Sequence, residues 1–279
     1  MRPLSELPDA ACARLLGVFT DIDDTLTTDG RLPAAAYAAL ERLDEAGLCV
    51  APITGRPAGW CDAVARLWPV RGVVGENGAF FFAYDRETRR MIRRFEQNAE
   101  TRAEGRRRLA ELAERIPMAV PGSAVAADQP YRESDLAIDF CEDVPPLPAE
   151  AAERIASLFA EAGATAKVSS IHVNGWFGTY DKLSMTRRFA REILGVDLDA
   201  ERDRFVFCGD SPDDAPMFGF FPYSCGVANV LEFRGRLPAE PAFVATREGG
   251  AGFVEIAERI LEGRRRAALR PEPARARHG

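Results

Sequence analysis

Short apolar runs alternate with amphipathic stretches along the first third of the chain. The runs are apolar at almost every position, as in strands that are buried on both faces of a parallel sheet. The amphipathic stretches repeat apolar residues at helical spacing, and Pro33 and Gly47 stand where a helix begins and ends. This alternation predicts a doubly wound parallel sheet with helices on both faces. The expected strands are residues 15–20, 48–53 and 72–74, and the expected helices are residues 33–46 and 57–68.

The pattern changes in the middle of the chain. Polar residues 85–88 interrupt an apolar stretch and predict a hairpin over residues 81–95. Two strand–helix units follow, which together with the hairpin predict a small α+β domain inserted into the first. The expected elements after the hairpin are a helix over residues 98–116, a strand over 136–140, a helix over 148–162 and a strand over 167–173.

The alternation of strands and helices resumes at residue 180. We therefore assign residues 1–81 and 180–263 to one α/β core domain, residues 82–179 to an inserted α+β cap domain, and residues 264–279 to a basic, disordered tail. The expected elements are a helix to residue 194, a strand over 205–208, a short helix near Met217, strands over 225–228 and 243–244, and a helix over 253–261.

Composition narrows the class of protein. The 279 residues are 47% hydrophobic and 28% charged, which is typical of a globular protein, and the formal charge of −7 disfavours nucleic acid as a partner. No apolar run is long enough to cross a bilayer, and the N-terminus lacks the apolar stretch of a secretory signal. The six cysteines form no C-x-x-C pair, and with two histidines a Cys/His zinc site is not expected. We expect a reduced, cytoplasmic protein with no membrane partner.

Three carboxylates, Asp21, Asp23 and Asp24, directly follow the first apolar run. The carboxyl end of a strand in an open α/β sheet is where ligands bind. Carboxylates this close together repel one another unless a cation lies among them, and oxygen ligands favour Mg²⁺ over Zn²⁺. A calcium loop of the EF-hand type is excluded, because it needs Gly and Glu where this chain has Leu26 and Leu32.

Further polar motifs also stand where a predicted strand ends or a predicted helix begins. Thr54 begins a T-G-R sequence after the second strand, and Asp210 lies in the acidic sequence G-D-S-P-D-D after the strand over residues 205–208. Lys182 stands at the start of a helix. Because the carboxyl ends of parallel strands meet at one edge of the sheet, we expect these groups to converge.

The set resembles the four signature motifs of the haloacid dehalogenase-like superfamily of phosphohydrolases. These are D-x-D-x-T-L from Asp21, T-G-R from Thr54, D-K at Lys182 and G-D-S-x-D-D around Asp210. The chain is most similar to the Cof-type branch, subclass IIB, which includes sucrose-phosphate, trehalose-phosphate and mannosyl-3-phosphoglycerate phosphatases and eukaryotic phosphomannomutases. The resemblance spans about residues 18–260, includes the E-N-G-A sequence from Glu76, and implies a Rossmann-like core with an inserted cap.

The resemblance implies a role for each motif residue. Asp21 would be the nucleophile that forms an aspartyl-phosphate. Asp23 would be the general acid to the leaving group and then the general base to water. Thr54 and Lys182 would bind the oxygens of the transferring phosphoryl group.

The resemblance also implies Mg²⁺ as the cofactor. The carboxylates of Asp21 and Asp210 and the main-chain carbonyl of Asp23 would hold the ion. Asp214 would order the metal's waters or orient Lys182.

Two positions depart from the branch's usual pattern. Asp213 stands where this branch often has Asn, and we take it as a weaker candidate metal ligand. Asp24 stands where relatives often have Gly, and we expect it to cap a helix or turn rather than to bind metal.

Substrate specificity is expected to come from the cap. Within residues 167–176, the side chains of Ser170, His172, Asn174 and Trp176 share one parity, and the apolar Ile171 and Val173 share the other. This pattern suits a sheet that covers a sugar-like ligand, and it suits a solvent-facing sheet equally well. The expected substrate-binding residues are Gly55, Arg56, Asn77, Ser170, His172 and Asn174, and Arg132 is a further candidate anchor for an anionic substrate.

We therefore expect a Mg²⁺-dependent phosphatase acting on a small phosphorylated metabolite, with a sugar phosphate favoured, in a monomer or homodimer. A sugar phosphomutase like the phosphomannomutases is the alternative enzyme, and it would need a basic second phosphate site in the cap. The basic residues available for this are Arg89, Arg90, Arg93 and Arg94. A non-catalytic phosphate-binding regulator is a further alternative, and a glycosyltransferase is disfavoured because it leaves Lys182 and the Asp210 loop without a role.

Overall fold

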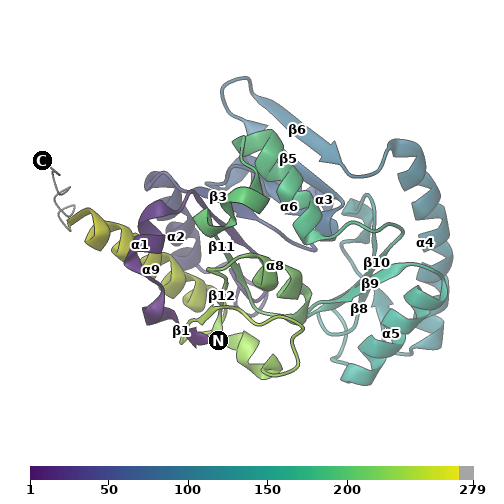
Figure 1. The fold of residues 1–279 in the computed structure, drawn as a ribbon. Helices are drawn as coiled ribbons and strands as arrows, with labels where there is room; N and C mark the ends of the chain where they lie inside the picture. Colours follow the sequence, from purple (N-terminus) through teal and green to yellow (C-terminus); the bar gives the residue numbers. More distant parts are fainter. Residues whose placement is uncertain (270–279) are drawn as a thin grey trace, which may run out of the picture.

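Six parallel strands form the central sheet of the larger lobe (Figure 1). The structure is a computed structural model that describes residues 1–269. Within this sheet β2 lies between β11 and β3, and Val18 stands opposite both Val206 and Val50. In spatial order the strands are β1 (Arg2–Pro3), β13 (Phe243–Val244), β12 (Cys225–Gly226), β11 (Phe205–Gly209), β2 (Gly17–Thr20) and β3 (Cys49–Pro52).

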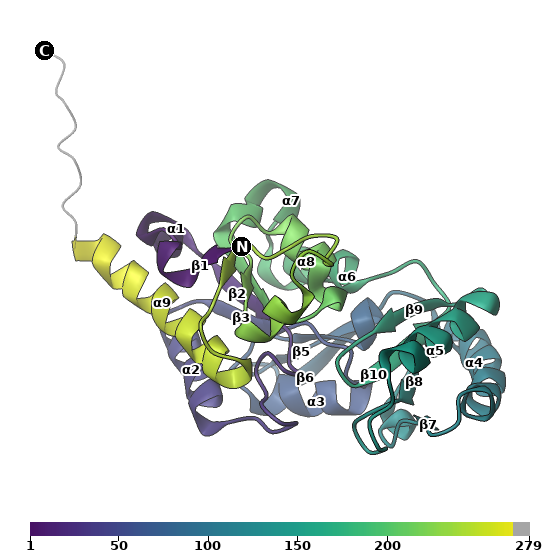
Figure 2. The ribbon, with the colours of Figure 1, turned by 90° about the horizontal axis from the view of Figure 1, so that it is seen from below.

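Helices cover both faces of this sheet (Figures 1 and 2). Val18 packs in one apolar cluster and its neighbour Phe19 in another, because successive strand residues point to opposite faces. The predicted doubly wound α/β fold is thereby confirmed. The first face carries α1 (Asp9–Arg14), α2 (Ala34–Glu45) and α9 (Gly249–Leu269), and the second carries α6 (Lys182–Phe189), α7 (Leu198–Glu201) and α8 (Ala215–Phe220). Shorter helical turns are η1 (Leu4–Glu6), η2 (Glu76–Gly78), η3 (Gln129–Tyr131), η4 (Ala190–Leu194), η5 (Arg202–Arg204), η6 (Pro212–Asp214) and η7 (Ala228–Phe233).

An antiparallel sheet of β4 (Val73–Gly75), β5 (Phe80–Asp85) and β6 (Arg90–Phe95) continues the core beyond β3. β4 is the expected third strand of the parallel sheet, but it pairs mainly with the hairpin strand β5. An isolated parallel bridge joins Val74 of β4 to Ile53, directly after β3. Phe81 packs among core residues such as Phe189, and Phe80 packs against α3 (Ala58–Leu67). The hairpin, expected within residues 82–179, is thus built onto the core rather than onto the sheet of the second lobe.

The second lobe contains a four-stranded antiparallel sheet (Figure 1). Leu109, Ile116, Ile155 and Phe159 from two helices pack against apolar strand residues in one buried cluster. The strands in spatial order are β7 (Ala124–Val125), β8 (Leu136–Asp139), β10 (His172–Trp176) and β9 (Thr165–Val168), and the helices are α4 (Ala99–Ala119) and α5 (Ala149–Glu161).

The expected single strand over residues 167–173 is instead the end of β9, a turn over residues 169–171 and the start of β10. Ser169 Oγ accepts hydrogen bonds from the backbone N–H of Ile171 and His172, which closes this turn. The predicted alternation of side chains is confirmed within β10. His172 and Asn174 face the site, and Val173 faces the apolar cluster of the lobe. The prediction was wrong for Ser170 and Ile171, because both lie in the turn and both line the site.

The chain leaves the core and returns to it at neighbouring points. Gln97 lies between β6 and α4, and its Nε2 donates a 2.7 Å hydrogen bond to the carbonyl oxygen of Phe177, just after β10. The two connections between the lobes therefore run side by side.

The C-terminal helix is longer than predicted. α9 continues to Leu269, so residues 264–269 are helical and not part of a disordered tail. The remainder of the predicted basic tail, residues 270–279, lies outside the described residues. Across residues 1–269, no helix has both the length and the apolar character that a membrane span requires.

Candidate active site

Asp21 stands directly after β2, where the backbone leaves the sheet. Its N–H donates to the carbonyl oxygen of Cys208 at 2.9 Å, so it continues the strand ladder by one residue. The chain then turns back through Ile22, whose carbonyl accepts from the N–H groups of Leu26 and Thr27. Asp24 has a φ of 55° in this turn, which explains why a glycine would suit its position.

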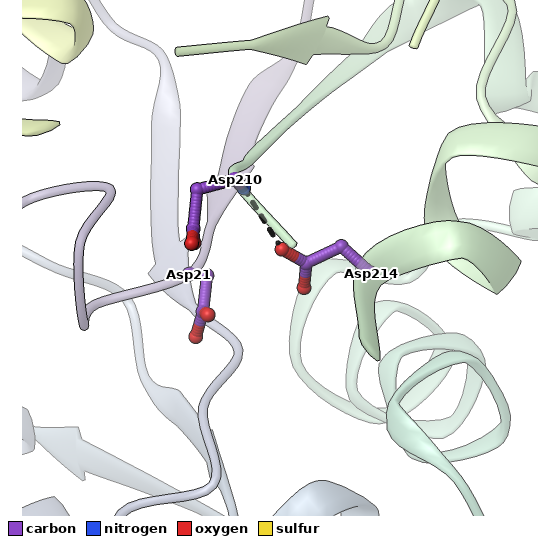
Figure 3. A group of neighbouring side chains, drawn as sticks. All are labelled: Asp21, Asp210 and Asp214. Atoms are coloured by element: carbon purple, nitrogen blue, oxygen red, sulfur yellow. Dashed lines mark hydrogen bonds between the residues drawn. The ribbon is translucent and has the colours of Figure 1, made fainter. Parts of the chain in front are cut away.

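Asp210 and Asp214 follow the neighbouring strand β11. One oxygen of Asp214 accepts from the backbone N–H of Asp210 at 3.0 Å, which folds η6 back over the end of the strand (Figure 3). A Cβ on Gly209 would lie 2.3 Å from that oxygen, so the turn requires glycine there. Thr25 Oγ1 donates to Asp210 Oδ1 at 2.9 Å and ties the two acidic loops together.

Asp21, Asp210 and Asp214 form a buried cluster, and one oxygen from each lies within 4.8 Å of the others (Figure 3). Burial raises the pKa of Asp21 well above its usual range despite Lys182, and burial and the neighbouring carboxylates do the same for Asp210. Such an arrangement is stable when a cation offsets the negative charge. The donors are all oxygens, which fits Mg²⁺.

Lys182 brings a positive charge to the edge of this cluster. It is the first residue of α6, which Asp181 caps through Ser184 N–H. Its Nζ lies 2.9 Å from Asp213 Oδ2, 2.9 Å from Asp214 Oδ1 and 3.5 Å from Asp21 Oδ2. Burial lowers the pKa of Lys182, but these carboxylates raise it well above its usual value, so the side chain stays charged.

Asp213, the weaker candidate metal ligand, lies beside the cluster rather than within it. Within the described residues, the group of carboxylates that could hold a metal contains Asp214 and lacks Asp213. The side chain of Asp213 pairs with Lys182 instead.

Asp23 is held by Arg56. The guanidinium donates to both carboxylate oxygens, from Nε at 3.0 and 2.9 Å and from Nη2 at 2.8 Å. The opposite side of the guanidinium donates to Glu142 of the second lobe, and its flat face lies 4.4 Å from the centre of the Trp60 ring. Carboxylates thus already occupy the donors of Arg56, the first candidate anchor for an anionic substrate.

Arg132, the second candidate anchor, is buried in an adjoining network, which shares Asp128 with Arg56. It pairs with Asp128 and Asp135 and donates to the carbonyl oxygen of Gly55 at 2.9 Å. Its side chain is 0% exposed and lines the cavity between the lobes, but these contacts occupy its donors and fix the second lobe to the T-G-R loop.

Glu76 forms a second tie between the lobes. It is 0% exposed, and its carboxylate accepts from the backbone N–H of Ala58 at the start of α3, and of Glu133 and Ser134 in the second lobe. These distances are 3.0, 2.9 and 2.6 Å.

All six expected substrate-binding residues come together around one cavity between the lobes. Asp21, Asp23, Lys182 and Asp210 line it as well. Thr54 and Asp214 are not among its lining residues and are 0% exposed. The cavity holds only about 20 Å³, which is room for about one water molecule. The six residues are Gly55, Arg56, Asn77, Ser170, His172 and Asn174.

Sequence reasoning missed some groups that shape this site. Glu142 stands in a loop without periodicity, and its importance depends on a contact with Arg56 that is distant in sequence. Thr25 could have been found, since it is the threonine of the D-x-D-x-T motif and bonds Asp210.

Comparison with known proteins agrees with this geometry. The model of a family described as haloacid dehalogenase-like hydrolase matches residues 18–102. Among curated proteins, no match was found.

Solved structures with the same fold cover nearly the whole chain. Protein 0175 of Thermoplasma acidophilum matches with a TM-score of 0.66 at 18% identity, covering 88% of this chain and 99% of that one. A HAD/COF-like hydrolase from Plasmodium vivax matches with a TM-score of 0.63 at 15% identity, covering 91% and 99%. The sucrose-phosphatase of Synechocystis sp. PCC6803, solved with sucrose and phosphate, matches with a TM-score of 0.61 at 14% identity, covering 88% and 98%. The resemblance to haloacid dehalogenase-like hydrolases is confirmed, and at these identities the structural likeness concerns the fold.

Proposed function

We propose that this chain is a Mg²⁺-dependent phosphatase that hydrolyses a small phosphorylated metabolite, a sugar phosphate, through an aspartyl-phosphate on Asp21. The observation that carries the proposal is the meeting of Asp21, Asp210 and Asp214 within 4.8 Å, with Lys182 Nζ 3.5 Å from Asp21. The family match over residues 18–102 supports hydrolase chemistry.

Asp21, Asp210 and Asp214 are the side chains that would hold the Mg²⁺, with the main-chain carbonyl of Asp23 as a further ligand. When bound, the ion would neutralise charge on the attacking carboxylate and on the phosphoryl oxygens.

In the first step, an oxygen of Asp21 attacks phosphorus and the bond from phosphorus to the leaving oxygen breaks. Asp23 gives its proton to that oxygen, so the sugar leaves as an alcohol. Lys182 and the hydroxyl of Thr54 bind the phosphoryl oxygens and stabilise their charge in the transition state.

In the second step, water attacks the phosphorus of the aspartyl-phosphate and Asp23 takes up the water's proton. The bond from phosphorus to the Asp21 oxygen breaks, which releases inorganic phosphate and restores the carboxylate. Two displacements replace one very slow hydrolysis.

The second lobe would act as a cap that selects the substrate. Ser170, His172 and Asn174 present polar groups to the cavity, and these can exchange hydrogen bonds with sugar hydroxyls. A cavity of about 20 Å³ is too small for a sugar phosphate, so the cap has to move for the substrate to enter. Closure afterwards would exclude bulk water from the aspartyl-phosphate.

The phosphomutase alternative finds less support in the hairpin arginines. Arg93 pairs with Asp62 at 2.6 Å and Arg94 with Glu192 at 3.0 Å. The lining of the cavity includes none of the four candidates, Arg89, Arg90, Arg93 and Arg94. Another basic group in the cap would have to bind the second phosphate.

A screen of about one hundred phosphorylated metabolites with Mg²⁺ tests the proposal by measuring free phosphate. We expect release from one or more sugar phosphates. Incubation with a sugar phosphate and a bisphosphorylated sugar activator tests the alternative, since isomerisation without net phosphate release would contradict the phosphatase.

A further inference from the structure

A carboxylate of the cap reaches across to the core. Glu142 Oε1 accepts from Arg56 Nη2 at 2.6 Å, and Oε2 accepts from Nη1 at 3.3 Å. The same guanidinium binds Asp23 through Nε and Nη2. One buried arginine, 5% exposed in its side chain, therefore joins the proposed acid–base residue to the cap.

The loop that carries Glu142 is fixed from within the cap. Asp139, at the end of β8, accepts from the backbone N–H groups of Cys141, Glu142 and Asp143 at 2.8 to 2.9 Å. His172 Nε2, on the neighbouring strand β10, lies 2.9 Å from Glu142 Oε2. The backbone around Glu142 is thus held by Asp139 and its carboxylate contacts His172, both of the cap, so Glu142 moves with the cap.

Glu142 also carries a stable negative charge. The contact with His172, followed by the pairing with Arg56, lowers the pKa of Glu142 to about 2. The carboxylate is therefore ionised at neutral pH and can hold the guanidinium from the cap side.

We propose that Glu142 is a positioning residue that acts through Arg56 on Asp23, so that Asp23 is correctly aimed only when the cap is seated on the core. This inference rests on the proposed phosphatase function and deepens it. Without the Glu142 carboxylate, Arg56 keeps Asp128 at 3.6 Å and the Trp60 ring, but it loses the two hydrogen bonds that oppose those to Asp23. The guanidinium can then rotate and take the Asp23 carboxylate with it.

The leaving group distinguishes this role from a merely structural one. Benzyl phosphate releases a strongly basic alkoxide, which needs the proton from Asp23 as its bond to phosphorus breaks. p-Nitrophenyl phosphate releases a weakly basic phenolate, which leaves without that proton. Since kcat/KM reports the steps up to this bond cleavage, a misplaced Asp23 lowers it more for benzyl phosphate.

The experiment compares kcat/KM for both substrates in the full-length enzyme with Mg²⁺. We expect Glu142→Gln to lower kcat/KM for benzyl phosphate about tenfold or more, and for p-nitrophenyl phosphate by a clearly smaller factor. Glu142→Asp keeps the charge but shortens the side chain. It should lower kcat/KM by smaller factors, and again more for benzyl phosphate than for p-nitrophenyl phosphate. Asp143→Asn, an exposed carboxylate one residue along the same loop, is the matched control and should change neither value.

Asp23→Asn is measured beside these variants, because it separates the two levels of the proposal. One outcome is that Asp23→Asn lowers kcat/KM selectively for benzyl phosphate while both Glu142 variants lower it by equal factors for the two substrates. In that case the role of Glu142 is refuted and the phosphatase stands. If the wild-type enzyme releases phosphate from neither substrate while the metabolite screen is also negative, the phosphatase and this inference fall together. If neither substrate is turned over but the screen is positive, two other values are compared in the Glu142 variants. These are kcat/KM for the best substrate of the screen and the inhibition constant of p-nitrophenyl phosphate as a competitor. A loss in kcat/KM with an unchanged inhibition constant supports the role of Glu142, and equal changes refute it.

Discussion

Lys182 Nζ, which is proposed to bind the phosphoryl group, lies 2.9 Å from Asp213 Oδ2 inside the site. Asp213 thus adds a negative charge beside the place that an anionic substrate would approach. This carboxylate both holds the ammonium group in position and competes with phosphate for it.

Replacing Asp213 by Asn should therefore strengthen phosphate binding. We expect the inhibition constant for inorganic phosphate to fall roughly fivefold, which corresponds to about 1 kcal/mol of removed repulsion. Competitive inhibition at fixed Mg²⁺ measures it. An unchanged or larger constant would mean that Asp213 serves mainly to orient Lys182.

Replacing Asp21 by Asn should abolish turnover. The amide is a poor nucleophile, and we expect kcat to fall by a factor of about 1000 or more. Because burial disfavours the charge of Asp21, the variant should be at least as stable as the wild type, which thermal unfolding without metal checks. Turnover of p-nitrophenyl phosphate at the wild-type rate by a folded variant would remove Asp21 from the mechanism.

Magnesium should both activate and stabilise the protein. EDTA should stop phosphate release and Mg²⁺ should restore it, and Mg²⁺ at a hundred times its dissociation constant should add about 2.7 kcal/mol to the free energy of unfolding. Asp210→Asn should lose this stabilisation, whereas Asp24→Asn, outside the cluster, should keep it. Calorimetric unfolding with and without Mg²⁺ gives the answer, and equal shifts in both variants would argue against the cluster as the metal site.

Glu76 should be important for stability rather than for chemistry. Glu76→Ala leaves the backbone N–H groups of Ala58, Glu133 and Ser134 without their acceptor, so we expect a loss of about 3 kcal/mol or more in the free energy of unfolding. Glu133→Ala removes a carboxylate that is 47% exposed and should cost less than about 0.5 kcal/mol. Urea denaturation of both variants tests this, and similar losses would contradict it.

The contribution of Glu142 to stability should depend on pH. Folding lowers the pKa of Glu142 from 4.5 to about 2, so its stabilising effect is complete above about pH 4.5 and is lost as the pH falls toward 2. The difference in free energy of unfolding between wild type and Glu142→Gln should therefore shrink over that range. A difference that stays constant from pH 5 to about pH 2 would mean that the charge of Glu142 is not what stabilises the fold.

The carboxylate edge of the core, where we propose the active site, could be predicted because its strands carry a strong local signal. The apolar runs of β2 and β11 lie side by side in register, so the carboxylates that follow them must meet. The motif spacing then placed Asp21, Asp210 and Lys182 at one point, and the cavity contains all six residues expected for the substrate.

The remaining features depend on contacts that no local pattern encodes. The turn at Ser169 contains neither Gly nor Pro, and it exists because a serine hydroxyl replaces the usual turn residues. The phenylalanines of β5 predict burial but not the lobe against which they pack. Glu142 becomes informative only once Asp139 has shaped its loop and Arg56 lies within reach.

The 2.7 Å hydrogen bond from the Gln97 side chain to the carbonyl oxygen of Phe177 joins the two crossings of the chain. A module whose entry and exit adjoin can be excised or exchanged with a linker of a few residues, and the rest of the chain keeps its path. Grafting the corresponding segment of a sugar phosphatase at these two points should carry over the proposed selectivity when the graft also supplies a carboxylate for Arg56 in place of Glu142.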